Sequence, residues 1–257
     1  MKRDLLIDLD GVFYQGNNVI PGAVEALGWI HQENIPHVFI TNTTSRPRIK
    51  IVKKLASFGI NVMEDSILTP PVAACKWLSK YASGPTALFI PKPTLDDFKT
   101  VPKLERGENN PTAVVLGDCG ENWTFNELNR AFTLLMAKSK PVLVALGMTR
   151  YWQAPEGLRL DVGPFVKALE YASGCKTFVL GKPSIHFFET ALQILQCDPS
   201  EAVMIGDDIV GDIQGAQHAG LQGILVRTGK FRLSDLNVDI RPDAVIDSIA
   251  NLPALWS

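Results

Sequence analysis

The stretch LLIDLDGVFYQG (residues 5–16) carries the pattern that decides the fold. A short apolar run ends in Asp8, and a second acid, Asp10, follows two residues later. The run has the length of a buried strand, so the two carboxylates would lie where that strand ends. A carboxylate is costly to bury without a partner. The pair therefore predicts either a strand end that frays into solvent or a site where a positive charge meets both acids.

Short apolar runs alternate with helical patterns in both the N-terminal and the C-terminal part of the chain. Strands are predicted over residues 37–41, 177–181, 202–206, 223–226 and 244–247, and helices over residues 21–34, 46–58, 184–196 and 209–219. This alternation predicts an α/β fold with a doubly wound, Rossmann-like parallel sheet covered on both faces. Residues 72–175 have strands and helices of their own. We therefore expect a core made of residues 1–71 and 176–257, with residues 72–175 inserted as an α/β cap.

The composition limits the possible functions. The chain has 257 residues, is 46% hydrophobic and 20% charged, and has a formal net charge of −2. This balance does not indicate a nucleic-acid surface, and no apolar run is long enough to span a membrane. The N-terminal apolar run is too short for a signal peptide. Four scattered cysteines without a CxxC pair indicate reduced thiols, so we expect a cytoplasmic protein.

Polar residues directly follow four of the predicted strands. They are Asp8 and Asp10, the pair Thr41-Asn42, Lys182, and the acids of GDDIVGD (206–212). In an open parallel sheet, ligands bind beyond the carboxyl ends of the strands. The four stretches would therefore meet in one site that requires both halves of the core.

This set of side chains suits a phosphate monoester and Mg²⁺. Asp8 and Asp207 are hard oxygen ligands for the ion, whose charge would let the carboxylates converge. Asp8 can attack phosphorus and form an aspartyl phosphate, while Asp10 can protonate the leaving oxygen and then deprotonate the hydrolytic water. Donors from Thr41, Asn42 and Lys182 would bind the phosphoryl oxygens.

Each stretch also has a simpler interpretation. The Asp8–Asp10 pair alone fits a strand-end turn, and Lys182 before a proline fits a solvated residue. The pair Thr41-Asn42 fits a helix cap, either instead of or besides phosphate binding. Not all the acids of 206–212 can be ligands. We expect direct coordination from Asp207, with Asp208 and Asp212 acting through waters or holding Lys182, although Asp212 could also be an exposed helix residue.

The stretches DLDGVFYQG, FITNTTS, VLGKP and VMIGDDIVGD together resemble the four motifs of the haloacid dehalogenase superfamily. The pair Thr41-Asn42 and the inserted cap are similar to its NagD-like branch with a type-2 cap. The stretches LDVGPFVKALEYASG and VRTGKFR narrow the resemblance to a subgroup whose substrates include pyrophosphate and compounds with a P–N bond.

The resemblance implies a phosphatase with Asp8 as the nucleophile. It implies a metal site made by Asp8, the backbone carbonyl of Asp10, and Asp207, and phosphate contacts from Thr41, Asn42 and Lys182. It also implies a homodimer formed through the cap. Some relatives have serine at the position of Asp10, and the acid here favours ester hydrolysis.

Three functions fit these residues. We expect a Mg²⁺-dependent hydrolase acting on a small phosphorylated molecule, since a cap that closes over the site leaves room for small leaving groups. A signalling domain phosphorylated on aspartate is the second, but such a domain is about half this length. A phosphate-binding protein that has lost catalysis is the third, and the complete set of polar residues argues against it.

Overall fold

The computed structural model describes residues 3–154 and 156–256. The chain forms two compact units. The first contains residues 3–41, 48–68 and 182–256, and the second contains residues 42–47 and 69–181. No helix among the described residues has both the length and the apolar character needed to cross a membrane.

The first unit is built on a six-stranded sheet in which every neighbouring pair is parallel. Its strand order is β14-β13-β12-β1-β4-β5. The strands are β1 (Asp4–Asp8), β4 (His37–Ile40), β5 (Ile67–Leu68), β12 (Ala202–Gly206), β13 (Gln222–Val226) and β14 (Ala244–Ile246). The chain runs outward from β1 to β4 and β5, and later from β12 to β13 and β14 on the other side. The predicted doubly wound sheet is confirmed, and its switch point lies between β1 and β12.

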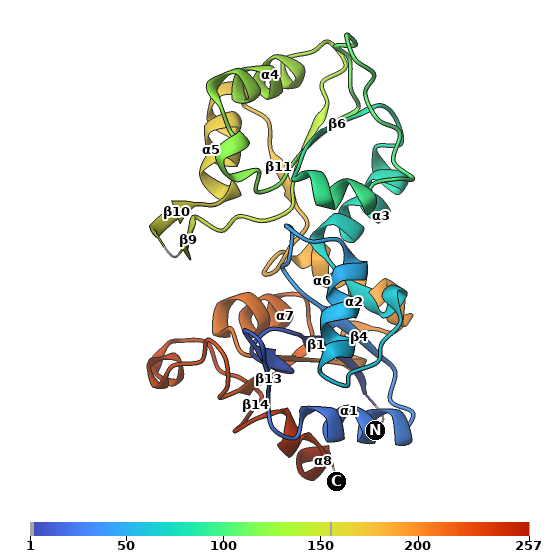
Figure 1. Cartoon of the computed structure of the whole chain (residues 1–257), viewed down its shortest axis with the longest axis vertical. Helices are drawn as coiled ribbons and strands as arrows, with labels where there is room; N and C mark the ends of the chain where they lie inside the picture. The colour runs from blue at the N-terminus through green and yellow to red at the C-terminus, as the bar shows by residue number, and fades with distance from the viewer. Residues whose placement is uncertain (1–2, 155, 257) are drawn as a thin grey trace. The chain divides into compact units, whose positions relative to one another are not determined.

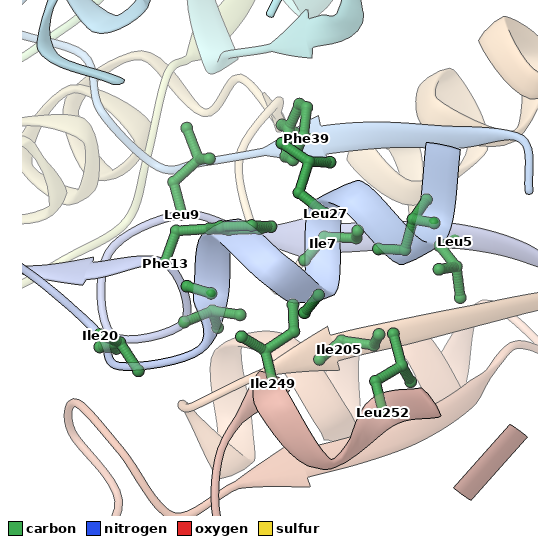
Figure 2. Close-up of a cluster of buried hydrophobic side chains, with 14 of the residues drawn as sticks. Leu5, Ile7, Leu9, Phe13, Ile20, Leu27, Phe39, Ile205, Ile249 and Leu252 are labelled. Atoms are coloured by element: carbon green, nitrogen blue, oxygen red, sulfur yellow. The ribbon is translucent and has the colours of Figure 1, made fainter. Parts of the chain in front are cut away.

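Helices cover both faces of this sheet (Figure 1). On one face, apolar side chains of alternate strand positions pack against α1 (Ala23–Gln32), α2 (Arg48–Ser57) and α8 (Leu252–Trp256). Figure 2 shows part of this core, with Leu5 and Ile7 of β1 facing Leu27 of α1. The opposite face is covered by a π-helix (Ile209–Gln214), by α7 (Gly215–His218) and by α6 (Ile185–Leu195). Strands buried on both faces account for the nearly continuous apolar runs of the sequence.

The second unit has a four-stranded parallel sheet of order β11-β8-β7-β6. Its strands are β6 (Thr86–Phe89), β7 (Ala113–Leu116), β8 (Val142–Ala145) and β11 (Thr177–Val179), and its helices are α3 (Pro70–Tyr81), α4 (Phe125–Leu135) and α5 (Val162–Ser173). Buried side chains of α4 and α5 pack against the sheet. The hairpin β9 (Tyr151–Ala154) and β10 (Gly157–Leu160) belongs to the same unit, and Pro155 lies outside the described residues.

Two elements differ from their predictions. Residues 177–181 were expected in the core sheet, but β11 pairs with β8 in the second unit. A short apolar run shows that a strand exists and not which sheet it joins. The helix expected over residues 209–219 is a six-residue π-helix followed by the short α7.

Candidate active site

Asp8 is the last residue of β1, and the residue is 6% exposed. Leu5 and Ile7 face the core next to α1, so the two-residue period of a strand turns Asp8 toward the opposite face. In the parallel register, Ile7 pairs with Ile205 of β12. Asp207 follows β12 directly, and the two acids therefore end neighbouring strands at the switch point.

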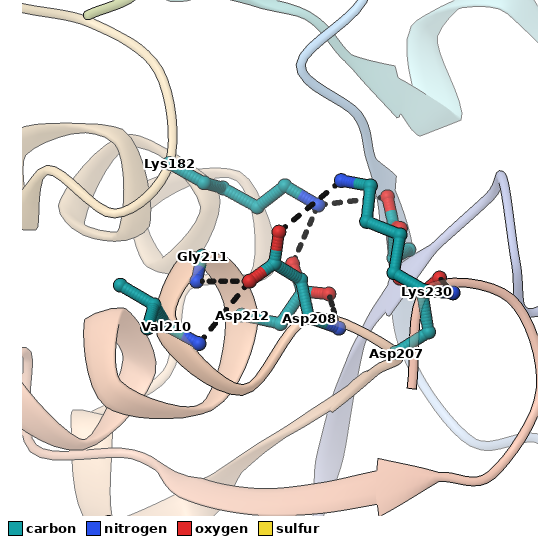
Figure 3. Close-up of polar contacts among 8 residues, drawn as sticks. Lys182, Asp207, Asp208, Val210, Gly211, Asp212 and Lys230 are labelled. Carbon is teal, nitrogen blue, oxygen red and sulfur yellow. Dashed lines mark hydrogen bonds and ion pairs between the residues drawn. The ribbon is translucent and has the colours of Figure 1, made fainter. Parts of the chain in front are cut away.

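Lys182 supplies a positive charge at this position (Figure 3). Its Nζ lies 2.7 Å from Asp8 Oδ1 and 2.6 Å from Asp212 Oδ1, and the lysine is only 8% exposed. Burial alone would lower the pKa of Lys182, but the carboxylates of Asp212 and Asp8 raise it above its usual value. The lysine therefore stays charged, and it fixes the orientation of Asp8.

Asp207 is almost fully buried, with 1% of its surface exposed. Its Oδ2 accepts a hydrogen bond of 2.6 Å from the backbone N–H of Lys230, and its Oδ1 is buried with no hydrogen-bond partner among the described residues. Burial, and next the nearby carboxylate of Asp8, raise the pKa of Asp207 to about 7. A buried carboxylate oxygen without a donor is rare in folded proteins, and a cation would satisfy it.

The acids at this position fit a hard metal ion. Carboxylate oxygens of Asp8, Asp207 and Asp212 all lie within 4.8 Å of one another, and all three residues are buried. Asp212 is already engaged by Lys182. A carboxylate oxygen of Asp8 and the unpartnered Oδ1 of Asp207 are therefore the atoms best placed to hold an ion such as Mg²⁺.

Asp208 and Asp212 shape the turn between β12 and the π-helix. Asp208 Oδ1 accepts hydrogen bonds from the backbone N–H groups of Val210 (3.1 Å) and Gly211 (2.8 Å), as Figure 3 shows. Asp212 Oδ2 accepts one of 3.1 Å from the N–H of Asp208. Asp212 is 1% exposed and so is not the exposed helix residue considered from the sequence. These hydrogen bonds to Asp208 and Asp212 stabilise the turn that follows Asp207.

Comparison with known proteins places this geometry in a family. A family model described as haloacid dehalogenase-like hydrolase matches residues 5–100, and one described as HAD-hydrolase-like matches residues 179–252. The human phospholysine phosphohistidine inorganic pyrophosphate phosphatase is 40% identical over 253 residues, which cover 96% of this chain and 92% of that protein. The chain belongs to the haloacid dehalogenase-like hydrolases. It is therefore an enzyme of the hydrolase class.

Other proteins similar to this haloacid dehalogenase-like hydrolase support the same family. The human haloacid dehalogenase-like hydrolase domain-containing protein 2 is 39% identical over 233 residues, covering 91% of this chain and 87% of that protein. A solved 4-nitrophenylphosphatase from Thermotoga maritima has a TM-score of 0.87 at 27% identity and covers 98% of this chain and 97% of that one. NagD from E. coli, at 24% identity, shares the fold with a TM-score of 0.86, covering 96% and 97% of the two chains.

The remaining predicted site residues of this hydrolase lie in three places. Thr41 follows β4, is 4% exposed, and donates its backbone N–H to Leu68 O. Asn42 belongs by its contacts to the second unit. Asp10 is exposed in the loop after β1, where the N–H of the next residue, Gly11, donates to Tyr14 O at 2.7 Å.

Lys230 is a site residue that the sequence reasoning did not single out. Its backbone N–H binds Asp207, and its Nζ lies 3.2 Å from Asp208 Oδ2 (Figure 3). Burial would lower the pKa of Lys230, but Asp208 and then Asp207 raise it. The rule that found the other residues would have found this one, because Thr228, Gly229 and Lys230 closely follow the end of β13.

Proposed function

We propose that the chain is a Mg²⁺-dependent phosphatase that forms an aspartyl phosphate on Asp8. The observation that carries the proposal is the buried arrangement of Asp8 beside both a cation, Lys182, and a second acid, Asp207. Several relatives and structural neighbours are named as phosphatases, which supports the same reaction class.

In the first step, a carboxylate oxygen of Asp8 attacks the phosphorus atom of the substrate. The new O–P bond forms as the bond between phosphorus and the leaving oxygen breaks, and the leaving oxygen takes a proton from Asp10. In the second step, a water oxygen attacks the same phosphorus and gives a proton to Asp10. The bond to Asp8 breaks, so inorganic phosphate leaves and both acids return to their starting states.

Charge around the reacting group comes from residues on neighbouring strands. Lys182 balances the negative charge of Asp8 and of the phosphoryl oxygens, and the hydroxyl of Thr41 donates to those oxygens. Asp8, the backbone carbonyl of Asp10, and Asp207 would hold Mg²⁺, which would supply further positive charge to the phosphoryl oxygens. Asn42 adds an amide donor, and Asp208 and Asp212 support the segment that carries Asp207.

We propose small phosphomonoesters as the substrate class. An alkyl leaving group needs a proton from an acid, and Asp10 can supply it, whereas a good leaving group does not need it. A related protein is named for phospholysine, phosphohistidine and pyrophosphate, so P–N compounds and pyrophosphate are the competing substrates. Values of kcat/KM over a panel of phosphorylated metabolites, with pyrophosphate and phospholysine included, decide between them.

The test compares p-nitrophenyl phosphate hydrolysis by the wild type, by Asp8→Asn and by Asp239→Asn. Asp239 is exposed and is not one of the site residues, so its variant controls for the lost charge. We expect Asp8→Asn to lose turnover, because an amide is no nucleophile, and Asp239→Asn to keep it. Excess chelator should abolish the wild-type activity and Mg²⁺ should restore it. Full activity in chelator, or in Asp8→Asn, would overturn the proposal.

The same assay separates the other functions. A signalling domain would take one phosphoryl group from a small donor and then stop, and a phosphate-binding protein would release no p-nitrophenolate. The homodimer formed through the second unit stays a prediction, and light scattering of the purified protein tests it.

A further inference from the structure

The segment Thr228–Lys230 contacts both acidic loops of the site. The hydroxyl of Thr228 donates to the backbone carbonyl of Gly11, which belongs to the loop after β1. The backbone N–H of Lys230 donates to Asp207 Oδ2 at 2.6 Å, and its Nζ lies 3.2 Å from Asp208 Oδ2. A segment that follows β13 therefore connects the loops that follow β1 and β12.

Two glycines enclose Asp207 Oδ2 between these loops. A Cβ atom on Gly11 or on Gly229 would lie 2.0 Å from that oxygen, and a Cβ on Gly229 would also lie 2.5 Å from Gly11 Cα. Both glycines have positive φ angles, +88° and +64°. Rotation of Asp207 alone would not relieve the second contact, because it is made with backbone.

One oxygen of Asp207 is thus occupied and the other is left without a partner. Oδ2 is held by the N–H of Lys230 and flanked by both glycines, while Oδ1 is buried and accepts no hydrogen bond from the described residues. With Oδ2 held in this way, the carboxylate has one orientation, and it presents Oδ1.

We propose that Thr228–Lys230 is a positioning segment that orients Asp207 for the metal ion. This inference rests on the proposed function, because it assigns Oδ1 of Asp207 to Mg²⁺. No atom of the segment takes part in the reaction steps. Its effect is on metal affinity, since groups that orient a metal ligand typically change affinity by about 10- to 100-fold when they are altered.

The test measures Mg²⁺ binding by calorimetry, without substrate, in the wild type, Gly229→Ala and Gly16→Ala. Gly16 has a similar φ of +60°, but a Cβ there would meet nothing within 4 Å. The two variants therefore share the positive φ and differ in the contacts with Asp207 and with Gly11 Cα. We expect about a 10-fold or greater loss of Mg²⁺ affinity in Gly229→Ala and little change in Gly16→Ala.

A second pair of variants keeps the test decisive if Gly229→Ala does not fold. Thr228→Val removes the hydroxyl that binds Gly11 O and keeps the side-chain shape. Thr133→Val is its control, because the Thr133 hydroxyl also donates to a backbone carbonyl, that of Asn129 in the second unit. We expect Thr228→Val to raise the Mg²⁺ concentration needed for half-maximal activity, with kcat recovered at saturating Mg²⁺.

The outcomes separate this inference from the proposed function. If the wild type binds Mg²⁺ and Asp207→Asn does not, but Gly229→Ala and Thr228→Val bind it as well as their controls, the positioning role is wrong and the proposed function stands. If the wild type itself does not bind Mg²⁺, both are overturned. A variant that loses stability but keeps its Mg²⁺ affinity shows a purely structural role and also overturns the inference.

Discussion

Lys182 Nζ lies 2.7 Å from Asp8 Oδ1, although 174 positions separate the two residues in the chain. Lys182 is also the first residue of the first unit after the second unit ends. The chain therefore returns to the core at the residue that neutralises Asp8. This contact joins the two sequence halves of the core at the site itself.

Lys182→Met should strongly destabilise the protein and abolish turnover. The lysine is buried between Asp8 and Asp212, and removing one member of a buried ion pair typically costs about 3–5 kcal/mol. Urea unfolding at neutral pH measures the loss. Lys176→Met is the matched control, because Lys176 is exposed and lies six residues earlier. Equal stability of the two variants would contradict a structural role for the buried pair.

Metal-free protein should lose stability as the pH rises toward 7. The pKa of Asp207 is raised from 3.8 to about 7, first by burial and then by Asp8, so the folded state binds more protons than the unfolded state in this range. Stability then falls between about pH 4 and pH 7 and levels off above. One pKa unit corresponds to about 1.4 kcal/mol, so the loss is of the order of a few kcal/mol.

The stabilisation of the protein by Mg²⁺ should have the opposite pH dependence. Below about pH 7 the ion competes with a proton on Asp207, so the rise in Tm on adding Mg²⁺ should grow with pH and then level off. The metal-free Asp207→Asn variant should lack most of the pH slope. Burial also raises the pKa of Asp212, which leaves a smaller slope of the same sign. A Mg²⁺-induced shift in Tm that is equal at low and high pH would contradict this assignment.

The sheet and the positions of its polar residues were predictable from the sequence. Apolar runs that end in Asp8, Thr41 and Asp207 form β1, β4 and β12, and the carboxyl ends of parallel strands must lie on one edge. The ion-pair partner of Lys182 was harder to predict from the sequence. The sequence offered Asp208 or Asp212, and only the π-helix geometry shows that Asp212 turns inward to the lysine.

Two features were not predictable because they depend on backbone geometry. Sequence periodicity does not show that β11 joins the sheet of the second unit, since a three-residue strand fits either sheet. The position of Lys230 after β13 could have marked it as a candidate, but its contact with Asp207 could not be predicted. That contact is made by a backbone N–H, which every residue except proline carries, so the side chain gives no signal for it.

Asp208→Ala should destabilise the protein by about 1 kcal/mol, the usual cost of removing a helix cap. Its Oδ1 accepts hydrogen bonds from Val210 and Gly211, and alanine offers no acceptor. Asp208→Asn is the matched control, because the amide oxygen can still accept these bonds. The ion pair with Lys230 is partly exposed and adds little. If Asp208→Asn lost as much stability as Asp208→Ala in urea unfolding, the charge and not the cap would be responsible.

Asp10→Asn should affect substrates according to their leaving groups. p-Nitrophenolate leaves without a proton, so Asp8 should still be phosphorylated by p-nitrophenyl phosphate. Water attack on the aspartyl phosphate lacks its base, and the phosphoenzyme should accumulate. Rapid mixing should show a burst of about one p-nitrophenolate per subunit, followed by slow turnover.

An alkyl phosphate gives the contrasting result for the same variant. Its alkoxide leaves poorly without a proton, so the first step should fail and no alcohol should be released in a burst. Asp8→Asn should show no burst with either substrate, which shows that the trapped phosphoryl group is on Asp8. If Asp10→Asn slowed both substrates equally and gave no burst, Asp10 would not be the acid and base. Its contribution would then be its backbone in the loop after β1, a part that serine at this position could also supply.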